Sequence, residues 1–334
     1  MFAPVESTAI SGGSAEHHLK RLSDPSVAQV GEILPRLGIT KRRFKQVESI
    51  CLVREQRVSG RQELAFNARP FVLCGLPLRR PLKDQLTHSR HSGKFFLQIL
   101  GHPDYGLPFG QDRLIPIWVA TLALKQKSRI VRFQSTAEML AFFRLQPDGF
   151  HYRRIEDGFK RIFASTIFFG TEDYPAGHKL IDWARFHFFD HMKLWFSTEE
   201  HNGGIEAEDQ GNMITLSEAF YNEIDQHRIP VEREVVSALA HAPGVLDFYL
   251  WLVWKTWTIN GHPARIPVLG PGGLNEQLGV ADYSLDRCFR HKILTWLTKV
   301  KALWPECPAY LTKDRRLLIV HSSRKSPAIR PVTN

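Results

Sequence analysis

Residues 149–170, with the sequence GFHYRRIEDGFKRIFASTIFFG, constrain the fold more strongly than any other part of the chain. Apolar side chains recur here every three or four residues, which predicts an amphipathic helix with one buried face. These side chains are Ile155, Phe159, Ile162 and Phe163. Residues 166–169 follow almost at once and are rich in β-forming residues, so the helix is expected to lead directly into a strand.

The opposite face of this predicted helix is basic. Successive residues of an α-helix are rotated by about 100°, which places several cations, with Asp157 among them, away from the apolar stripe. The candidate DNA contacts on this helix are Tyr152, Arg153, Arg154, Lys160 and Arg161. Upstream, residues 135–145 predict a short amphipathic helix, and residues 146–149 have the composition of a tight turn. Helix, turn, basic helix and strand are typical of a helix-turn-helix whose second helix enters a DNA groove.

A basic helix can equally be an ordinary surface helix with a solvated charged face, and the charge of the whole chain bears on the choice. The formal net charge is +10, which favours a polyanionic partner. Lys and Arg outnumber Asp and Glu in residues 1–150 and 251–334, whereas residues 201–250 are acidic. Positive charge is therefore concentrated in two regions, one on each side of an acidic segment.

The pattern before the acidic segment predicts a first winged-helix domain over residues 66–200. Its expected elements are strands at 71–76 and 94–100 with a basic loop between them, a buried helix at 111–127, a strand at 128–133, the helix pair described above, and one or two strands within 179–196. Residues 1–65 are expected to form an N-terminal extension that is partly disordered and weakly helical.

Residues 201–211 predict an acidic linker, and residues 212–321 predict a second winged-helix domain with the same layout. Its expected elements are a strand at 213–216, a helix capped by Ser217, a helical region at 232–257 broken at 242–244, a strand at 265–269, a short helix at 274–278, a long helix at 284–304 and a hairpin at 310–320. Residues 322–334 are expected to be a disordered basic tail. The predicted fold class is α+β, with two winged-helix domains in tandem.

The long helix of the second domain also has one apolar and one basic face. The apolar stripe consists of Leu285, Phe289, Ile293, Trp296, Val300 and Leu303, and the opposite face carries Arg287, Arg290, His291, Thr298 and Lys301. A basic turn in the following hairpin has the character of a wing that contacts flanking phosphates, through Lys313, Arg315 and Arg316.

The cations are expected to divide into two roles. The arginines best placed to reach guanine edges are Arg153, Arg154, Arg287 and Arg290. Lys160, Arg161 and the three cations of the hairpin turn are expected mainly to neutralise phosphates. Binding through phosphates would make the affinity strongly dependent on salt.

Enzyme signatures are weak in this sequence. No G-x-x-x-x-G-K-[ST] loop is present, and the glycines at 270–273 lack the lysine of a phosphate-binding loop. His187, Asp190 and His191 offer the alternative of a metal site or a strand-cleaving nuclease, but on a strand Asp190 would face away from the two histidines. The sequence therefore predicts a protein without catalytic residues, metal or cofactor.

The sequence also predicts a cytoplasmic protein that does not enter the membrane. The four cysteines, Cys51, Cys74, Cys288 and Cys307, are widely spaced, which suits a reducing compartment better than a disulfide framework. The longest apolar run, residues 245–254, is too short to span a bilayer.

Two motifs resemble those of plasmid-encoded RepA replication initiators. They are LPFGQDR at residues 107–113, which continues into LIPIWVATLALKQKSR, and DGFHYRRIEDGFKRIFASTIFFGTE from residue 148, and the best match covers about residues 66–196. The resemblance implies tandem winged helices, sequence-specific binding of double-stranded origin DNA, often as direct repeats, and recruitment of host replication proteins. It also implies a possible homodimer, since dimers of related initiators tend to repress and monomers to initiate.

Further partners and rival functions follow from the same reasoning. The expected host partners are the helicase or its loader and, through residues 62–66 (QELAF), which loosely resemble a clamp-binding peptide, the sliding clamp. A transcriptional repressor with the same DNA-binding parts is one alternative function. A metal-dependent nucleic-acid-processing enzyme that uses His187, Asp190 and His191 is the other.

Overall fold

The structure, a computed structural model, describes residues 40–173, 178–195, 211–278 and 286–323. The predictions for residues 1–39, for most of the acidic linker, for the start of the long helix and for residues 324–334 lie outside these ranges. By its internal contacts the chain divides into two compact units, Met1–Cys51 and Leu52–Asn334. The described part of the first unit, residues 40–51, is helical from Lys41, and all features below belong to the second unit.

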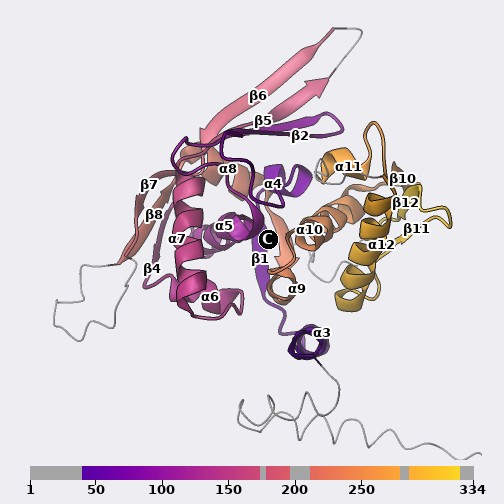
Figure 1. The fold of residues 1–334 in the computed structure, drawn as a ribbon, viewed down its shortest axis with the longest axis horizontal. Coiled ribbons are helices and arrows are strands. Elements are labelled where there is room, and N and C mark those ends of the chain that lie inside the picture. The colour runs from indigo at the N-terminus through magenta and orange to yellow at the C-terminus, as the bar shows by residue number, and fades with distance from the viewer. Residues whose placement is uncertain (1–39, 174–177, 196–210, 279–285, 324–334) are drawn as a thin grey trace, which may run out of the picture. The chain divides into compact units, whose positions relative to one another are not determined.

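The second unit combines helices with short antiparallel strands, so the predicted α+β class is confirmed (Figure 1). The helices are α3 (Lys41–Val58), which begins in the first unit, α4 (Arg69–Leu73), the 3-10 helix η1 (Gly110–Arg113), α5 (Leu114–Gln126), α6 (Ala137–Phe142), α7 (Gly149–Phe163), α8 (Glu218–His227), α9 (Arg233–Leu239), α10 (Pro243–Thr258), α11 (Leu274–Gln277) and α12 (Asp286–Leu303). The strands are β1 (Leu64–Asn67), β2 (Thr87–Ser92), β3 (Phe95–Leu100), β4 (Ile130–Phe133), β5 (Thr166–Asp173), β6 (Leu180–His187), β7 (Phe189–Lys193), β8 (Asn212–Leu216), β9 (Ile229–Glu232), β10 (Ala264–Pro267), β11 (Ala309–Leu311) and β12 (Leu317–Val320).

Two three-stranded sheets repeat one topology. The first has the order β4-β8-β7, and its strands alternate along the chain with the helices α5, α6 and α7; the second has the order β10-β12-β11, and its strands alternate with α10, α11 and α12. In each case one helix leads into an edge strand, and two further helices follow. Two more strands complete the sheet, and the later of them lies between the other two. All pairs in both sheets are antiparallel. The chain therefore contains the same series of elements twice.

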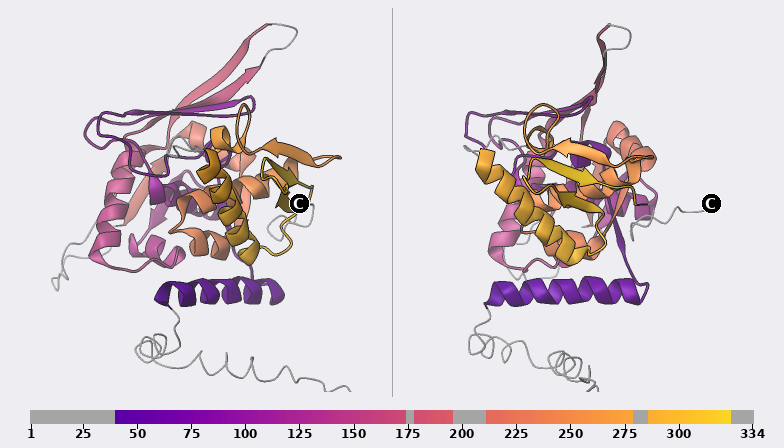
Figure 2. Two further views of the ribbon diagram at one scale, coloured as in Figure 1. Left: turned by 45° about the vertical axis from the view of Figure 1, so that its right-hand side comes forward. Right: turned by 90° about the vertical axis from the view of Figure 1, so that its right-hand side faces the viewer.

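The first series carries an insertion between α7 and β7. The inserted strands β5 and β6 pair with each other and join β2 and β3 in a four-stranded sheet of order β2-β3-β5-β6. The β5–β6 hairpin extends away from the helices of this unit in the views of Figure 2. A further pair, β1 with β9, joins residues that lie far apart in the sequence.

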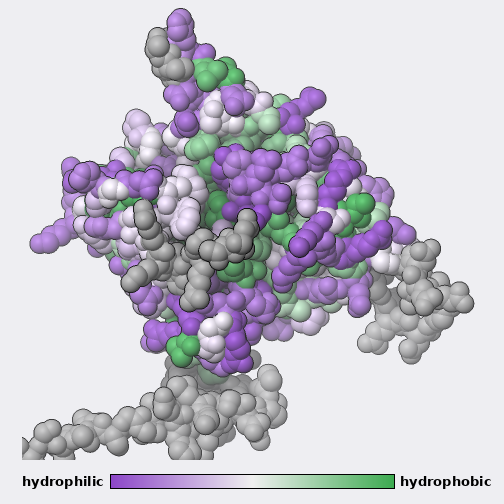
Figure 3. All heavy atoms as spheres, turned by 180° about the vertical axis from the view of Figure 1, so that it is seen from behind, coloured by the Kyte–Doolittle hydropathy of each residue, from purple (hydrophilic) through white to green (hydrophobic). Residues whose placement is uncertain are grey.

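Helices α5 and α10 form the core of the two series. Both are apolar all round their circumference, as expected for central helices that are covered on every side. Trp118 of α5 and Trp251 of α10 are among the largest fully buried side chains. The surface seen from behind is mainly hydrophilic, with small hydrophobic areas between polar ones (Figure 3). In the part of the chain that the structure describes, no helix combines the length and apolar character needed to cross a membrane.

One predicted strand is wrong. Residues 71–76 were expected to form a strand, but residues up to Leu73 belong to helix α4, which has Pro70 in its first turn. Proline fixes φ near the helical value and lacks the N–H that the first turn does not need, so it favours a helix start. Because residues 71–73 are all buried, their apolar run had no period that could separate helix from strand. Strands β1, β2 and β9 were not predicted at all.

The other predicted elements within the described residues are confirmed to within a few residues. They include the helices at 111–127, 135–145 and 284–304, the two strands within 179–196, and the helix capped by Ser217, whose hydroxyl accepts a hydrogen bond from Phe220 N at 3.2 Å. The strand expected at 213–216 is β8, and it pairs with β4 and β7 on the other side of the predicted linker. The predicted domain boundary thus falls between two paired strands.

Candidate nucleic-acid interface

Helix α7 begins at a well-formed cap. The Asp148 carboxylate accepts a hydrogen bond from His151 N at 2.9 Å and lies 2.8 Å from His151 Nδ1. These contacts, the backbone one foremost, hold the pKa of Asp148 below its usual value. A carboxylate at this position also complements the positive end of the helix dipole. The cap fixes where α7 starts and thereby which of its side chains face outward.

The apolar face of α7 packs inward as predicted, with one exception. Ile155, Phe159 and Ile162 are buried, whereas Phe163, the last residue of the helix, is 39% exposed. Phe163 was expected in the core, and this expectation is wrong because the helix ends there. The outward face presents Phe150, Arg153, Asp157 and Lys160 to solvent.

The four cations of α7 have different surroundings. Arg153 is exposed. Lys160 is exposed as well and donates a hydrogen bond to Glu156 at 2.6 Å, a contact that raises the pKa of Lys160. Arg154 is half-buried, and burial lowers its pKa. Tyr152 is half-buried too. Only Arg153 and Lys160 therefore project fully from the basic face that the helical period predicts.

Arg161 is held by a buried carboxylate. Its Nε and Nη2 donate to the two oxygens of Asp112 at 2.7 and 3.0 Å, and its guanidinium lies over the ring of Phe109. The side chains of Arg161 and Asp112 are only 12% and 2% exposed. A bidentate, desolvated pair of this kind has little freedom to exchange its carboxylate for a phosphate. Sequence reasoning gave Arg161 a phosphate-contacting role; that role stays a prediction, while the visible role of Arg161 is to fix α7 to η1.

A glycine in the middle of α7 makes this close approach possible. A Cβ at Gly158 would lie 2.8 Å from Asp112 Oδ1 and 2.9 Å from the Ile115 side chain. Glycine costs a helix about 1 kcal/mol relative to alanine, so its presence at this position trades helix propensity for proximity to Asp112.

We expect Gly158→Ala to lower the free energy of unfolding, because overpacking costs about 1–3 kcal/mol and outweighs the gain in helix propensity. Gly149→Ala, on the same helix, is the matched control, since a Cβ there meets nothing within 4 Å. Urea denaturation of both variants measures the difference. Equal stabilisation by the two substitutions would contradict the packing described here.

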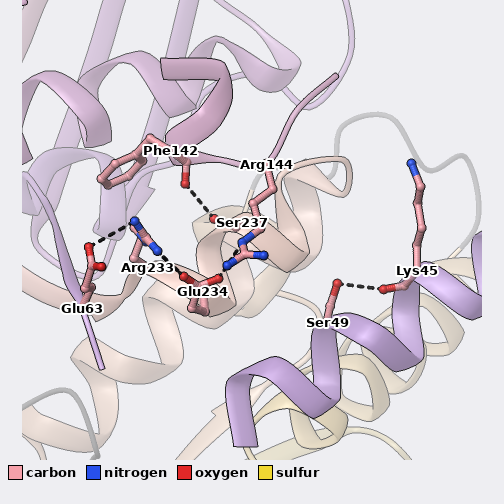
Figure 4. A network of polar contacts seen from close by, with 8 residues as sticks. All are labelled: Lys45, Ser49, Glu63, Phe142, Arg144, Arg233, Glu234 and Ser237. Atoms are coloured by element: carbon pink, nitrogen blue, oxygen red, sulfur yellow. Dashed lines mark hydrogen bonds and ion pairs between the residues drawn. The ribbon is translucent and has the colours of Figure 1, made fainter. Parts of the chain in front are cut away.

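An ion pair and a hydrogen bond join α9 to the end of α6 and the turn that follows it (Figure 4). Arg144 lies 3.0 Å from the buried Glu234, and Ser237 donates a hydrogen bond to Phe142 O at 3.1 Å. Glu234 also accepts from its neighbour Arg233, which in turn lies 3.1 Å from Glu63. Arg144 has a positive φ of 52°, so the turn is left-handed at this residue. The helix-turn-helix element is therefore supported from outside its own helices.

The second basic helix, α12, resembles the sequence expectation closely. Five residues of its predicted stripe are buried, namely Phe289, Ile293, Trp296, Val300 and Leu303, while Leu285 lies outside the described residues. Arg287 and His291 are exposed, and Lys301 is half-buried. Arg290 is half-buried as well, and its Nε makes no hydrogen bond within the described chain.

The hairpin after α12 presents its three cations at a tip that is held by hydrogen bonds to Asp314. Asp314 accepts hydrogen bonds from the Thr312 hydroxyl at 2.5 Å and from Arg316 N at 3.1 Å, and the Thr312 contact foremost lowers the pKa of Asp314. Arg315 adopts a left-handed φ of 56° in this turn. Lys313, Arg315 and Arg316 are all exposed. The tip thus offers cations on a hairpin that directly follows a basic helix.

Two residues of the alternative metal site, His187 and Asp190, engage other groups. His187 Nδ1 lies 3.2 Å from Ser165 O, and Asp190 forms an ion pair with Arg129 at 3.2 Å. Across the described ranges, no group of three or more His, Cys, Asp or Glu side chains is arranged to hold a metal ion. The structure gives no support to a metal-dependent enzyme at these positions.

Comparison with known proteins finds one family model that matches part of the chain, from α7 to β10. Residues 150–266 match the family model described as plasmid-encoded RepA protein. The resemblance to that family is confirmed, but the matched segment overlaps the predicted one, residues 66–196, only from residue 150 onward and does not include LPFGQDR. No curated protein matches the sequence.

Two solved structures are similar to the chain. The crystal structure of RctB domains 2–3 (RctB 155–483) has 12% identity and a TM-score of 0.46, and covers 73% of this chain and 92% of that one. A selenomethionine derivative of domains 2 and 3 of RctB has 12% identity and a TM-score of 0.45, and covers 69% of this chain and 84% of that one.

Proposed function

We propose that this protein, whose residues 150–266 match the family model of plasmid-encoded RepA proteins, is a replication initiator that binds double-stranded origin DNA through two winged-helix modules. The observation that carries the proposal is the repeated topology of the second unit. In each series a basic helix, α7 or α12, directly precedes or adjoins a sheet of the same strand order. A helix-turn-helix followed by such a sheet is the layout of winged-helix DNA-binding proteins.

The modules we propose differ in extent from the domains expected at 66–200 and 212–321. The first runs from α5 to β8 and the second from α10 to β12, with β5 and β6 as an insertion in the first. Under this division β7 and β8 form the first wing and β11 and β12 the second. Helices α8 and α9 and strand β9 connect the modules.

The exposed cations of the two helices are the best candidates for contacts with bases. Arg153 on α7 and Arg287 on α12 have the exposure and the bidentate donor geometry that suit guanine edges. Lys160, His291 and the tip of the second wing are suited to phosphates. Tyr152, Arg154, Arg290 and Lys301 are half-buried, so we assign them supporting positions beside the contact.

The host partners follow the same proposal. An initiator of this kind would pass origin DNA to a helicase or its loader, and a homodimer could repress its own gene. Residues 62–66, the suggested contact with the sliding clamp, lie mostly in β1, where Leu64 and Phe66 pair with Glu232 and Pro230. A clamp contact at this site would have to release β1 from β9.

Footprinting on the DNA that flanks the gene, at two salt concentrations, tests the function. We expect discrete protected repeats whose affinity falls steeply with salt, because the binding releases counterions from phosphates. Arg153→Ala or Arg287→Ala should each weaken specific binding by about 1–3 kcal/mol. Lys313→Ala should weaken all sequences alike and reduce the salt slope by about one.

Arg228→Ala is the control for these variants, since Arg228 is an exposed cation at the end of α8, outside both helices. Its affinity should equal that of the wild type. Uniform weak coverage of the DNA would contradict sequence-specific binding. An origin-transformation assay with the gene supplied in trans separates an initiator from a repressor, because only an initiator would support replication.

A further inference from the structure

Three consecutive side chains of η1 reach three different elements. Gln111 contacts the turn before α10, Asp112 contacts α7, and Arg113 contacts α10 itself. These residues belong to the LPFGQDR motif, for which DNA binding alone requires no role. We propose that η1 is a bracket that sets the distance and rotation between the two DNA-reading helices, and so specifies the spacing of the two half-sites on the DNA. This inference rests on the proposed function.

The first arm of the bracket is Asp112. Besides its bidentate contact with Arg161, its Oδ2 accepts a hydrogen bond from Phe109 N at 2.9 Å. The carboxylate is therefore fixed to the backbone of its own turn, and α7 is fixed to the carboxylate. Because the contact lies near the C-terminal end of α7 and Gly158 lets the helix approach, rotation of α7 about its axis would break both hydrogen bonds.

The second arm is Arg113, which contacts α10 rather than α7. Its Nε donates to Asp247 Oδ1 of α10 at 2.8 Å, and the two side chains are 5% and 4% exposed. The remaining donors bind backbone carbonyls of Gly110 and Leu76 at 2.7 and 2.8 Å. Burial raises the pKa of Asp247 to about 6 even though Arg113 opposes this shift. The ion pair thus carries a high desolvation cost.

The third arm is Gln111. Its Nε2 lies 2.9 Å from Ala240 O and 3.0 Å from His241 Nδ1, in the turn between α9 and α10. Gln111 therefore holds the turn that leads into α10, and Arg113 holds α10 itself within its first turns. Contacts on both the turn and the helix oppose a rotation of α10 about either contact.

Helix α10 packs closely against α12, the second proposed DNA-binding helix, so the position of α10 fixes that of α12. A Cβ at Gly244 would lie 2.3 Å from the Trp296 ring of α12, and the rings of Phe248 and Trp296 are 6.2 Å apart. A path of contacts thus runs from α7 through Asp112 and Arg113 to α10 and then to α12. No step of this path crosses a segment outside the described residues.

Polar contacts fix the relative position of two helices more specifically than apolar contacts do. Replacing a buried ion pair by apolar side chains is often neutral for stability, so such a pair is weak evidence of a stabilising role. Its directional hydrogen bonds do, however, select one geometry, whereas apolar surfaces can slide over each other. A protein that must present two helices to DNA at a fixed separation has a use for such selection, because the groove position turns with every base pair.

The experiment measures spacing preference. Duplexes are made from the footprinted site with zero, one, two or three base pairs inserted between the half-sites, and a further duplex carries one half-site alone. The wild type should lose about tenfold or more in affinity with two inserted base pairs, because each rotates the second half-site by roughly 35°. Arg113→Met/Asp247→Leu should reduce that loss to about twofold and leave the affinity for the single half-site unchanged.

Arg69→Met/Glu223→Leu is the matched control. It removes an ion pair of 3.0 Å that joins α4 to α8 and involves neither η1 nor α10, and it should keep the spacing preference of the wild type. Arg113→Lys is the second variant in case the double substitution does not fold, because it keeps the charge but loses the forked geometry. It should show an intermediate spacing preference.

The outcomes are separable. A wild-type spacing preference in both bracket variants overturns the inference, as does loss of single half-site binding together with the preference, which indicates a merely structural role. A wild type that binds its site regardless of spacing also overturns it, while leaving the proposed function intact. A wild type that protects no DNA overturns the proposed function itself.

Discussion

Replacing Asp112 by alanine is expected to lower the free energy of unfolding by about 3–5 kcal/mol, the usual cost of removing one member of a buried ion pair. The side chain is 2% exposed, and its loss leaves the charge of Arg161 without a carboxylate and Phe109 N without an acceptor. Arg154, which Asp112 also attracts, would lose part of its stabilisation. Urea denaturation followed by tryptophan fluorescence measures the change.

Asp190→Ala is the control for this prediction. Asp190 also pairs with an arginine, Arg129, but the two side chains are 48% and 44% exposed. Solvent screens such a pair, so its removal should cost no more than about 1 kcal/mol. Similar losses in the two variants would show that the burial of Asp112 has no energetic consequence, and the central position given to η1 would then be wrong.

Trp251→Ala should be destabilising to a comparable extent, by about 3–5 kcal/mol. Trp251 has no exposed surface, and its Nε1 donates a hydrogen bond to Gln277 Oε1 at 2.9 Å. The same oxygen accepts from Ser92 of β2 at 3.1 Å. The substitution would therefore open a large cavity and also loosen the contact between α10, α11 and the four-stranded sheet.

Helix α10 supplies its own control. Trp257 lies on the same helix but is 46% exposed, so Trp257→Ala should change the stability by no more than about 0.5 kcal/mol. Trp251→Phe should fall between the two alanine variants, since it keeps most of the apolar volume and loses only the hydrogen bond and part of the ring. Calorimetry of the three variants would check this order, and a large loss from Trp257→Ala would contradict it.

Much of the local structure can be predicted from the sequence, because apolar side chains recur at a clear helical spacing. The stripe from Ile155 to Ile162 and the longer one in α12 have an unmistakable helical spacing, and both were confirmed. Ser217 predicts the start of α8 because its hydroxyl can cap the first turn of a helix. Where neither a period nor a cap existed, as in the apolar run after Pro70, the prediction failed.

The arrangement of the candidate interface could be predicted only in part. A helical wheel places Arg153 and Arg161 on the same broad face, because it contains no information about what lies beside the helix. The difference between them arises from Asp112, which is distant in sequence. The sequence contains the motif around Asp112, but the partners of that carboxylate depend on tertiary packing. Pairing of β8 with β4 was equally beyond reach, since antiparallel partners of this kind are set by non-local contacts.

The repeated strand order bears on how the protein can be divided. The segment that matches the RepA family begins inside α7 and ends within β10. A polypeptide cut at those limits would keep β5, β8, β9 and β10 but lose their partners β3, β4, β1 and β12, so these four strands would each be left with an unpaired edge. Unpaired edges invite pairing with other molecules. Expression of that fragment would thus yield aggregates, and the unit that folds on its own is longer than the segment that matches the family model.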